Sequence, residues 1–170
     1  MRQASGPSLI PVTAMNPTLC PEFPVEWQPA LRHSFYLRQL LEARPDVVSW
    51  LNEHWQQPVD TNVMQEFLNT NPITDEDGLR RILRQLRQRT MAALIVRDLG
   101  ERASLAEVVE TMTLLADTTT NVALDFLHGQ LASTFGEPLD HQGNPQRLLV
   151  IGMGKLGGRE LNVSSDVDYI

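Results

Sequence analysis

The sequence contains little of what marks several large classes of protein. Its one cysteine, Cys20, cannot form a disulfide bond within the chain. Its four histidines do not combine with that cysteine at the spacing of a zinc site. No segment approaches the roughly 18 consecutive apolar residues that a membrane-spanning helix requires. We therefore expect neither a disulfide framework nor a zinc centre nor a membrane protein.

Positive charge is also scarce. The 170 residues include 14 lysines and arginines against 21 aspartates and glutamates, which gives a net charge of −7. Such a chain repels a phosphate backbone unless its bases gather on one surface, so nucleic acid is not expected as a partner. The first 25 residues also lack the charged start and apolar core of a secretory signal, so we expect a cytoplasmic protein.

Proline and turn residues divide the chain into three regions. Residues 1–25 contain five prolines and show neither helical nor strand periodicity, which predicts a disordered leader. Residues 26–135 have helical periodicity throughout, which predicts an all-α unit. At residue 136 the character changes to glycine, proline and polar residues, so a further domain is expected over residues 136–170.

The helical region begins with short elements. An apolar face from Trp27 to Leu41 predicts one helix that ends before Pro45. Two shorter helices are expected around Trp50 and Phe67. These three helices are short, so we expect them to pack against longer neighbours.

Two long helices follow. Thr74 is the expected N-cap of the first, ahead of three acidic residues, and Gly100 is its expected C-cap. Ser104 and Glu107 have the spacing of a capping box, which predicts the start of the second. Its apolar seam has steps of three and four residues: Leu105, Val108, Met112, Leu115, Thr119, Val122 and Phe126. The short connection predicts an antiparallel pair.

Basic residues gather on the first long helix. They are Arg80, Arg81, Arg84, Arg87 and Arg89. Contact with a nucleotide or an acidic partner is one interpretation of them, but acids at a helix start and bases further along are ordinary helix chemistry. We therefore interpret these arginines as a solvated face.

The last region combines a strand-type run with two carboxylates. Residues 147–151 are apolar and bounded by turn residues, which predicts a strand. If Asp166 and Asp168 also lie on a strand, both carboxylates share one face and Val167 points into the core. A hard divalent cation such as Mg²⁺, or Mn²⁺ in its place, explains two neighbouring carboxylates.

A glycine-rich turn lies between the predicted strand and the carboxylates. Glycines let a backbone approach a phosphate closely, and Lys155 beside Gly154 supplies a compact positive charge. Strand, turn, base and carboxylates in this order are the parts that phosphoryl or nucleotidyl transfer requires. Each part also has an ordinary structural interpretation: a solvated strand end, a surface lysine and a tight turn.

Two other phosphate-binding motifs resemble the glycine turn in part. Gly152, Gly154 and Gly157 have the spacing of the dinucleotide-binding fingerprint, but that fingerprint requires a long helix and an acidic residue about 20 positions on. A P-loop requires Ser or Thr after its lysine, whereas Leu156 follows Lys155. The nucleotidyl-transfer interpretation therefore fits the motif better than either.

The segment 152–168, GMGKLGGRELNVSSDVD, closely resembles the signature of the bacterial glutamine synthetase adenylyltransferase family. The helical segments 79–84 and 97–99 also look like that family's amino-terminal region, so the resemblance covers about residues 27–170. Its members are bifunctional: they transfer AMP to a tyrosine of glutamine synthetase and remove it again. The resemblance thus implies an enzyme that regulates nitrogen assimilation.

The resemblance implies a fold and a set of roles. The family carries two nucleotidyltransferase domains of the polymerase-beta type, each with its own copy of the motif. The amino-terminal copy removes AMP by phosphorolysis, with inorganic phosphate and ADP as reactant and product, and the other copy uses ATP. By this resemblance, Gly154 and Lys155 belong to the phosphate-binding turn, and Asp166 and Asp168 are catalytic residues and metal ligands.

We therefore expect a mainly α chain, in which a helical bundle precedes the truncated start of an α+β nucleotidyltransferase domain. The family's further strands, third carboxylate, regulatory region and second catalytic domain are not in the sequence. The expected partners are glutamine synthetase and, through the missing part, a PII-type signal protein. We expect the fragment to be inactive alone, with residues 147–170 poorly ordered or prone to aggregation because they lack pairing partners. The alternative is a helical protein-binding module with a non-functional motif remnant.

Overall fold

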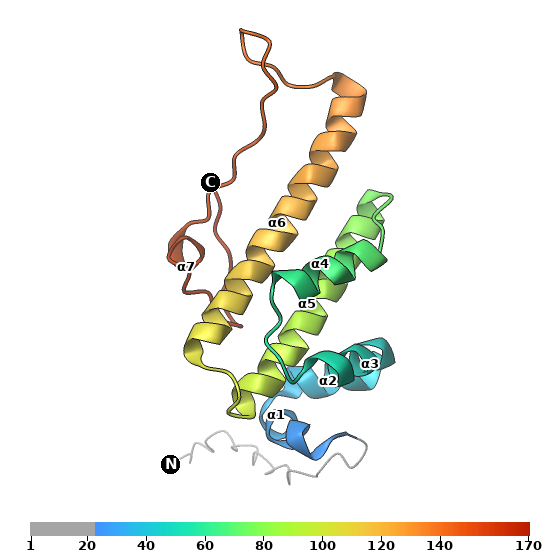
Figure 1. The fold of residues 1–170 in the computed structure, drawn as a ribbon, viewed down its shortest axis with the longest axis vertical. Helices are drawn as coiled ribbons and strands as arrows, with labels where there is room; N and C mark the ends of the chain where they lie inside the picture. The colour runs from blue at the N-terminus through green and yellow to red at the C-terminus, as the bar shows by residue number, and fades with distance from the viewer. Residues whose placement is uncertain (1–22) are drawn as a thin grey trace, which may run out of the picture.

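The computed structural model describes residues 23–170, which form a mainly α-helical structure (Figure 1). The elements in chain order are η1 Val25–Trp27, α1 Gln28–His33, α2 Phe35–Ala43, α3 Pro45–His54, α4 Thr61–Thr70, α5 Glu76–Leu99, α6 Leu105–Phe135 and α7 Gly154–Gly157. The predicted leader, apart from its last three residues, lies outside the described residues. No helix in the range 23–170 is long and apolar enough to cross a membrane.

The first helix predicted from the sequence is in fact two helices. The break falls at Ser34, whose hydroxyl accepts a hydrogen bond from the backbone N–H of Leu37 at 3.1 Å. This bond makes Ser34 the N-cap of α2. A serine that satisfies a free N–H of the next turn favours a new helix start over continuation, so the prediction of one unbroken helix was wrong here.

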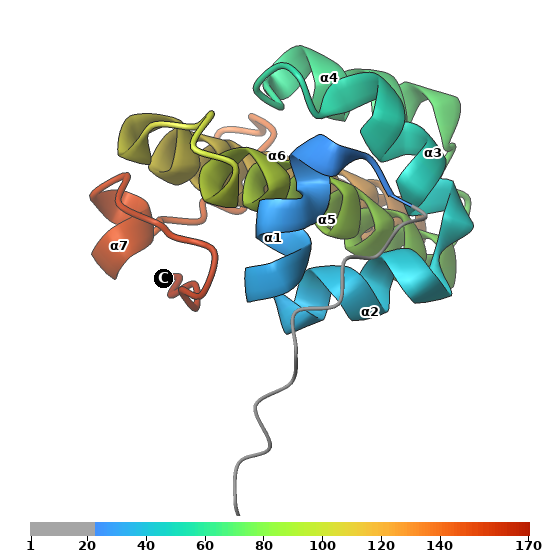
Figure 2. The same cartoon turned by 90° about the horizontal axis from the view of Figure 1, so that it is seen from below.

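The core of the helical region surrounds α5. Residues 91–97 of α5 are all buried: an apolar run over 91–96 is followed by the buried Arg97. Helices α1, α2, α3 and α4 pack against it, and Trp27, Leu51 and Met64 contribute side chains with no exposed surface. Figure 2 shows these helices grouped around α5 on the side away from α7. This cluster makes α5 the central helix of the unit.

The ends of α5 differ slightly from the prediction. Asp75, not Thr74, is the N-cap, because its carboxylate accepts the N–H of Gly78 at 2.6 Å. Gly100 is the C-cap, as predicted, but its φ of −90° is ordinary. A side chain is excluded there by space, because a Cβ on Gly100 would lie 2.6 Å from the carbonyl oxygen of Val96.

Helices α5 and α6 form the predicted antiparallel pair, joined by a short connection (Figure 1). The Ser104 hydroxyl accepts the N–H of Glu107 at 3.2 Å, which is one half of a capping box. The Glu107 carboxylate does not complete the box. It accepts two hydrogen bonds from the buried guanidinium of Arg97, at 2.5 and 2.9 Å. The same glutamate therefore joins the two long helices.

The predicted seam of α6 is buried only in part. Val108, Met112 and Leu115 are buried against the other helices, whereas Leu105 is 77% exposed. Further along, the helix extends beyond the core, and Phe135 at its end is 81% exposed. The apolar repeat of α6 thus continues beyond the part of the helix that packs against α4 and α5.

One arginine of the predicted solvated face is buried. Arg80, Arg81, Arg84 and Arg87 are not buried, as expected. Arg89 is only 8% exposed; it donates to the carboxylate of Asp46 at 2.7 Å and lies over the ring of Phe67. The solvated-face prediction was wrong for Arg89, because α3 and α4 cover this turn of α5.

Beyond α6, residues 136–170 consist of turns, extended segments and the short helix α7, and no strand is assigned in the described residues. Isolated antiparallel bridges join Leu139 to Pro145 and Gly152 to Tyr169. The predicted strand over 147–151 and the predicted α+β domain start are therefore not confirmed. Two extended segments without a third neighbour form at most a short pairing, which is the physical reason for the difference.

Candidate functional site

The glycine-rich turn forms around the single turn of α7. Gly154 begins it with a φ of +53°, in the left-handed region that favours glycine. Lys155 follows and is exposed, so its charge faces solvent. Leu156 is buried in the core cluster of the helical region. The turn is thus attached by its leucine and presents Gly154 and Lys155 outward.

Two more glycines are required by close contacts. A Cβ on Gly157 would lie 2.5 Å from the carbonyl oxygen of Gly152. A Cβ on Gly152 would lie 2.7 Å from side-chain carbons of Leu156. The turn folds back on itself too tightly for side chains at these positions. The need for a tight turn is therefore enough to explain why both residues are glycine. Neither contact requires a ligand.

The two predicted carboxylates lie on the segment that returns past this turn. The N–H of Met153 donates to the carbonyl oxygen of Asp168 at 2.9 Å, so the segments run antiparallel. The Asp168 carboxylate approaches the turn: its Oδ2 lies 3.6 Å from where a Cβ of Gly154 would be. Asp166 is exposed two residues earlier. The structure thus brings Asp168 and Gly154 together.

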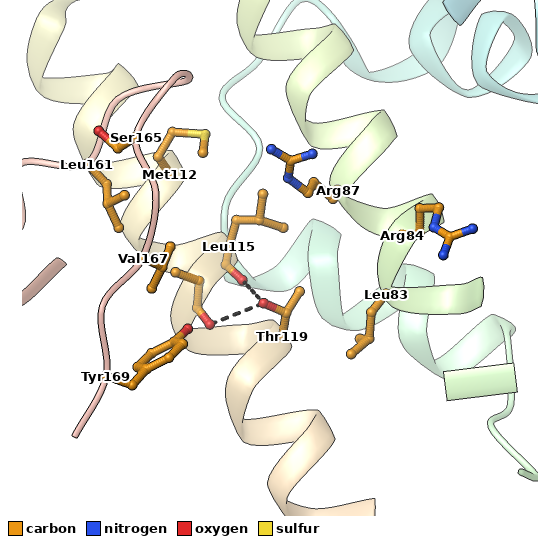
Figure 3. Close-up of a pocket in the computed structure, with 11 residues that line it drawn as sticks. Leu83, Arg84, Arg87, Met112, Leu115, Thr119, Leu161, Ser165, Val167 and Tyr169 are labelled. Carbon is orange, nitrogen blue, oxygen red and sulfur yellow. Dashed lines mark hydrogen bonds between the residues drawn. The ribbon is translucent and has the colours of Figure 1, made fainter. Parts of the chain in front are cut away.

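Side chains alternate along this segment as an extended chain requires. Val167 and Tyr169 line a cleft of about 450 Å³ against α5 and α6, with Met112, Leu115 and Arg87 on its other side (Figure 3). Neither aspartate lines it. Asp168 faces Gly154 instead, and Val167 faces the helices while remaining 38% exposed. That Asp166 shares the face of Asp168 stays a prediction from period-two alternation.

Asp168 is the carboxylate placed beside this turn, and the exposed Asp166 precedes it by two residues. Within residues 23–170, no group of three or more histidine, cysteine, aspartate or glutamate side chains is placed to hold a metal ion. Mg²⁺ commonly takes one or two protein carboxylates and completes its shell with water and substrate phosphates. Two carboxylates match that number of protein ligands, and the metal role of Asp166 and Asp168 stays a prediction.

The residues that attach this turn to α6 were not foreseen. Arg159 donates to both carboxylate oxygens of Glu110, at 2.8 and 2.9 Å, and this hydrogen bond and charge raise the pKa of its guanidinium. The hydroxyls of Tyr169 and Thr120 share a hydrogen bond of 2.6 Å. Both pairs join residues 49 apart in sequence, and no local pattern predicts such partners.

Comparison with known proteins agrees with the resemblance seen in the sequence. The family model of glutamate-ammonia ligase adenylyltransferase matches residues 27–170. A relative from Aromatoleum aromaticum is 47% identical over 145 residues, which are 83% of this chain and 15% of the relative. One from Bordetella pertussis is 43% identical over 148 residues, which are 83% of this chain and 16% of the relative.

A third relative, from Thioalkalivibrio sulfidiphilus, is 54% identical over 96 residues, which are 56% of this chain and 10% of the relative. All three relatives are named bifunctional glutamine synthetase adenylyltransferase/adenylyl-removing enzyme. The chain spans 15–16% of the length of the first two, so the likeness concerns a small part of each.

Proposed function

Because the chain belongs to the glutamate-ammonia ligase adenylyltransferase family of nucleotidyltransferases, we propose that Asp166 and Asp168 serve a site that removes AMP from glutamine synthetase. The observation that carries the proposal is the approach of Asp168 to the left-handed turn at Gly154. A carboxylate beside a tight, exposed backbone turn and a lysine is an arrangement suited to nucleotide phosphates.

Each predicted residue has a role in this proposal. Asp166 and Asp168 would hold Mg²⁺ or Mn²⁺, which supplies positive charge near nucleotide phosphates when bound. The exposed Lys155 attracts the same phosphates as a point charge, and the bare backbone at Gly154 leaves them room. The two aspartates are the residues on which the activity depends most.

The helical unit before the motif supports the AMP-removing reaction rather than the forward transfer from ATP, because that order resembles the family's amino-terminal copy. In the removal, an oxygen of inorganic phosphate bonds to the phosphorus of the AMP group. The bond from that phosphorus to the tyrosine oxygen breaks, ADP leaves, and the tyrosine oxygen regains a proton. Lys155 would help to bind the incoming phosphate.

The proposal also names the reaction partners and the cellular location. The names of the relatives support glutamine synthetase as the protein substrate. Phosphate and ADP would be the small-molecule reactant and product of the removal, and ATP the reactant of the opposite transfer. A PII-type signal protein would act through parts of such an enzyme outside this chain. We place these reactions in the cytoplasm, where this substrate and these nucleotides meet.

A chimera tests the function. This chain replaces the matching segment of the Aromatoleum aromaticum relative, and AMP removal and AMP transfer are both measured on glutamine synthetase. Asp166→Asn and Asp168→Asn should each lower removal by at least about 100-fold and leave transfer within about twofold. Asp77→Asn, which removes a carboxylate that is 90% exposed on α5, should change neither.

Three results would count against the proposed function. An unmodified chimera without removal activity would show that this chain does not serve as the family's segment. Removal that survives both asparagine substitutions would show that the carboxylates are not part of the site. A loss of transfer instead of removal would assign the motif to the forward reaction.

A second candidate function rests on a different observation. Leu127, Leu131 and Phe135 recur every four residues on the free end of α6 and are 39%, 57% and 81% exposed. Such an apolar stripe favours a docking role for the helical unit. Direct binding of glutamine synthetase to this chain, lost in Leu131→Lys, would support docking; unchanged binding by that variant would exclude this stripe.

A further inference from the structure

Helix α6 holds the candidate site through three polar contacts spread along its length. Glu110 accepts two hydrogen bonds from Arg159, and Thr120 shares one with Tyr169. Asp125 accepts one from Arg147 at 3.0 Å. At 1.5 Å of rise per residue, the contacts at residues 110 and 120 are about 15 Å apart. The two contacts therefore flank the returning segment with both aspartates.

The apolar contacts between residues 154–170 and the helices are strong but not directional. Leu161 has no exposed surface and Leu156 is 6% exposed, both within the core cluster. Burial of this kind favours attachment without specifying one register, because the hydrophobic effect depends on area. Hydrogen bonds require a distance and an angle, so the polar contacts are the ones that set the register.

Tyr169 is placed to set the orientation of Asp168. It follows Asp168 directly, its backbone bridges to Gly152, and its ring lines the cleft against α6 (Figure 3). Because neighbouring side chains of an extended chain point to opposite sides, a tyrosine turned to α6 leaves Asp168 facing Gly154. A slip by one residue would turn Asp168 to α6 instead.

Arg159 lies on the other side of the aspartates in sequence from Tyr169 and also contacts α6. It follows the glycine turn with a left-handed φ of +56°, and its guanidinium contacts both carboxylate oxygens of Glu110. The two side chains are 54% and 51% exposed, so the pair contributes little to stability. Two hydrogen bonds to one carboxylate do restrict the direction of the arginine, which suits a role in orientation.

From these contacts we propose that Tyr169 and Arg159 are positioning residues, through which Thr120 and Glu110 of α6 fix the two aspartates against the glycine turn. The inference rests on the proposed function for its catalytic consequence, but its structural part stands on the contacts alone. Helix α6 would then do more than pack against α5: its side chains would fix the position of the segment that contains the aspartates.

Amide hydrogen exchange on the 170-residue chain tests the structural part. The N–H groups of Ile151, Met153 and Ile170 pair across the two extended segments and report on their register. Thr120→Val and Tyr169→Phe should each speed exchange at these amides by about five- to tenfold, and the double variant should be no faster than either single variant. Tyr36→Phe, at a tyrosine 41% exposed, should have no effect there.

Two outcomes of the exchange experiment would overturn the proposal. Unchanged exchange at these amides in both single variants would show that the hydroxyl pair sets no register. Equal acceleration at the amides of α5 would show a general loss of stability instead of a local change in position.

The chimera tests the catalytic consequence. Glu110→Gln and Tyr169→Phe should raise the Mg²⁺ concentration for half-maximal AMP removal about three- to tenfold without a change in unfolding temperature. Exchanging the charges, with Glu110→Arg and Arg159→Glu together, should restore most of the lost affinity. Glu76→Gln is the matched control, because its pair with Arg80 has similar exposure and lies on α5 instead of α6.

The two hypotheses fail in different ways. If Asp168→Asn abolishes removal while Glu110→Gln and Tyr169→Phe leave the Mg²⁺ requirement unchanged, the function stands and the positioning role is wrong. If Asp168→Asn retains removal, the proposed function is wrong, and the exchange experiment alone then decides whether α6 sets the register.

Discussion

The helical unit and the segment after it show how differently helices and extended chain depend on their neighbours. Helices α1–α6 bury one continuous apolar cluster around α5. In residues 136–170, only Leu156 and Leu161 are buried, while Leu148, Leu149 and Ile170 are at least 72% exposed. A helix satisfies its backbone hydrogen bonds internally, whereas an extended segment must find a neighbour. The second region therefore relies on α6 and on its own glycine turn.

The largest expected effect comes from the contact that joins the two long helices. Arg97 is 6% exposed and donates to Glu107 and to the carbonyl oxygen of Gln56 at 2.8 Å. Arg97→Met leaves a glutamate without its buried partner, so we expect the free energy of unfolding to fall by about 3–5 kcal/mol. Urea unfolding followed by circular dichroism measures this loss.

The matched control for Arg97→Met is Arg80→Met. Arg80 also pairs with acids, Glu76 and Asp77, but its side chain is 65% exposed. We expect a loss below about 0.5 kcal/mol. Equal losses in the two variants would mean that the Arg97 contact is no more important than a surface pair.

A second substitution asks whether the two regions unfold together. Leu161 has no exposed surface and attaches the last segment to the helices. Leu161→Ala should cost about 2–3 kcal/mol, seen as faster amide exchange in residues 151–170. Exchange in α5 should not change. Acceleration in both places would show that the molecule is one cooperative unit and would remove the contrast between the regions.

Replacing two glycines by alanine should change stability in opposite directions. Gly157→Ala forces a Cβ against the carbonyl oxygen of Gly152, so the turn should lose about 1–3 kcal/mol, measured by faster exchange of the Gly158 amide. Gly129 lies inside α6, and the position that a Cβ would take there has open space around it out to 4 Å. Gly129→Ala should therefore raise the free energy of unfolding by about 0.5–1 kcal/mol. A loss in Gly129→Ala would indicate a hidden contact on α6.

A small effect is expected on the acid stability of the helical unit. Hydrogen bonds from Arg44 and then Arg89 lower the pKa of Asp46 to about 2. A lowered pKa stabilises the fold above the ordinary carboxyl range, and the stabilisation is lost as pH falls from about 4 to 2. Because Asp46 is 45% exposed, we expect Asp46→Asn to cost only about 1 kcal/mol at pH 7.

The measurement for Asp46→Asn is urea unfolding at pH 7 and at several values down to pH 2. The difference between wild type and variant should shrink steadily below pH 4. A difference that stays constant over this range would mean that the ionised carboxylate is not what stabilises α3 against α5.

Local signals explain most of what the sequence predicted about the helices. The starts at Ser104 and near Asp75, and the end at Gly100, depend on residues within one turn of the boundary. The break at Ser34 was missed because the apolar periodicity continues through it. Burial of Arg89 was missed for a different reason: its partner Asp46 is 43 residues away in sequence.

The candidate site was predictable in composition but not in attachment. Alternation alone places Asp166 and Asp168 on one face, and the glycines indicate a tight turn. Whether Asp168 faces Gly154 depends on Tyr169 and Thr120, which are far apart in the chain. The expected strands are not confirmed: residues 151–153 pair with residues 168–170 over a short stretch only, and longer strands require further neighbours.

The most direct test of the central claim follows labelled inorganic phosphate. The chimera is incubated with adenylylated glutamine synthetase and ³²P-phosphate, and the labelled product is identified. Our account predicts label in ADP, with loss of that label in Asp168→Asn. Release of unlabelled AMP, or labelled ADP that persists in Asp168→Asn, would contradict it.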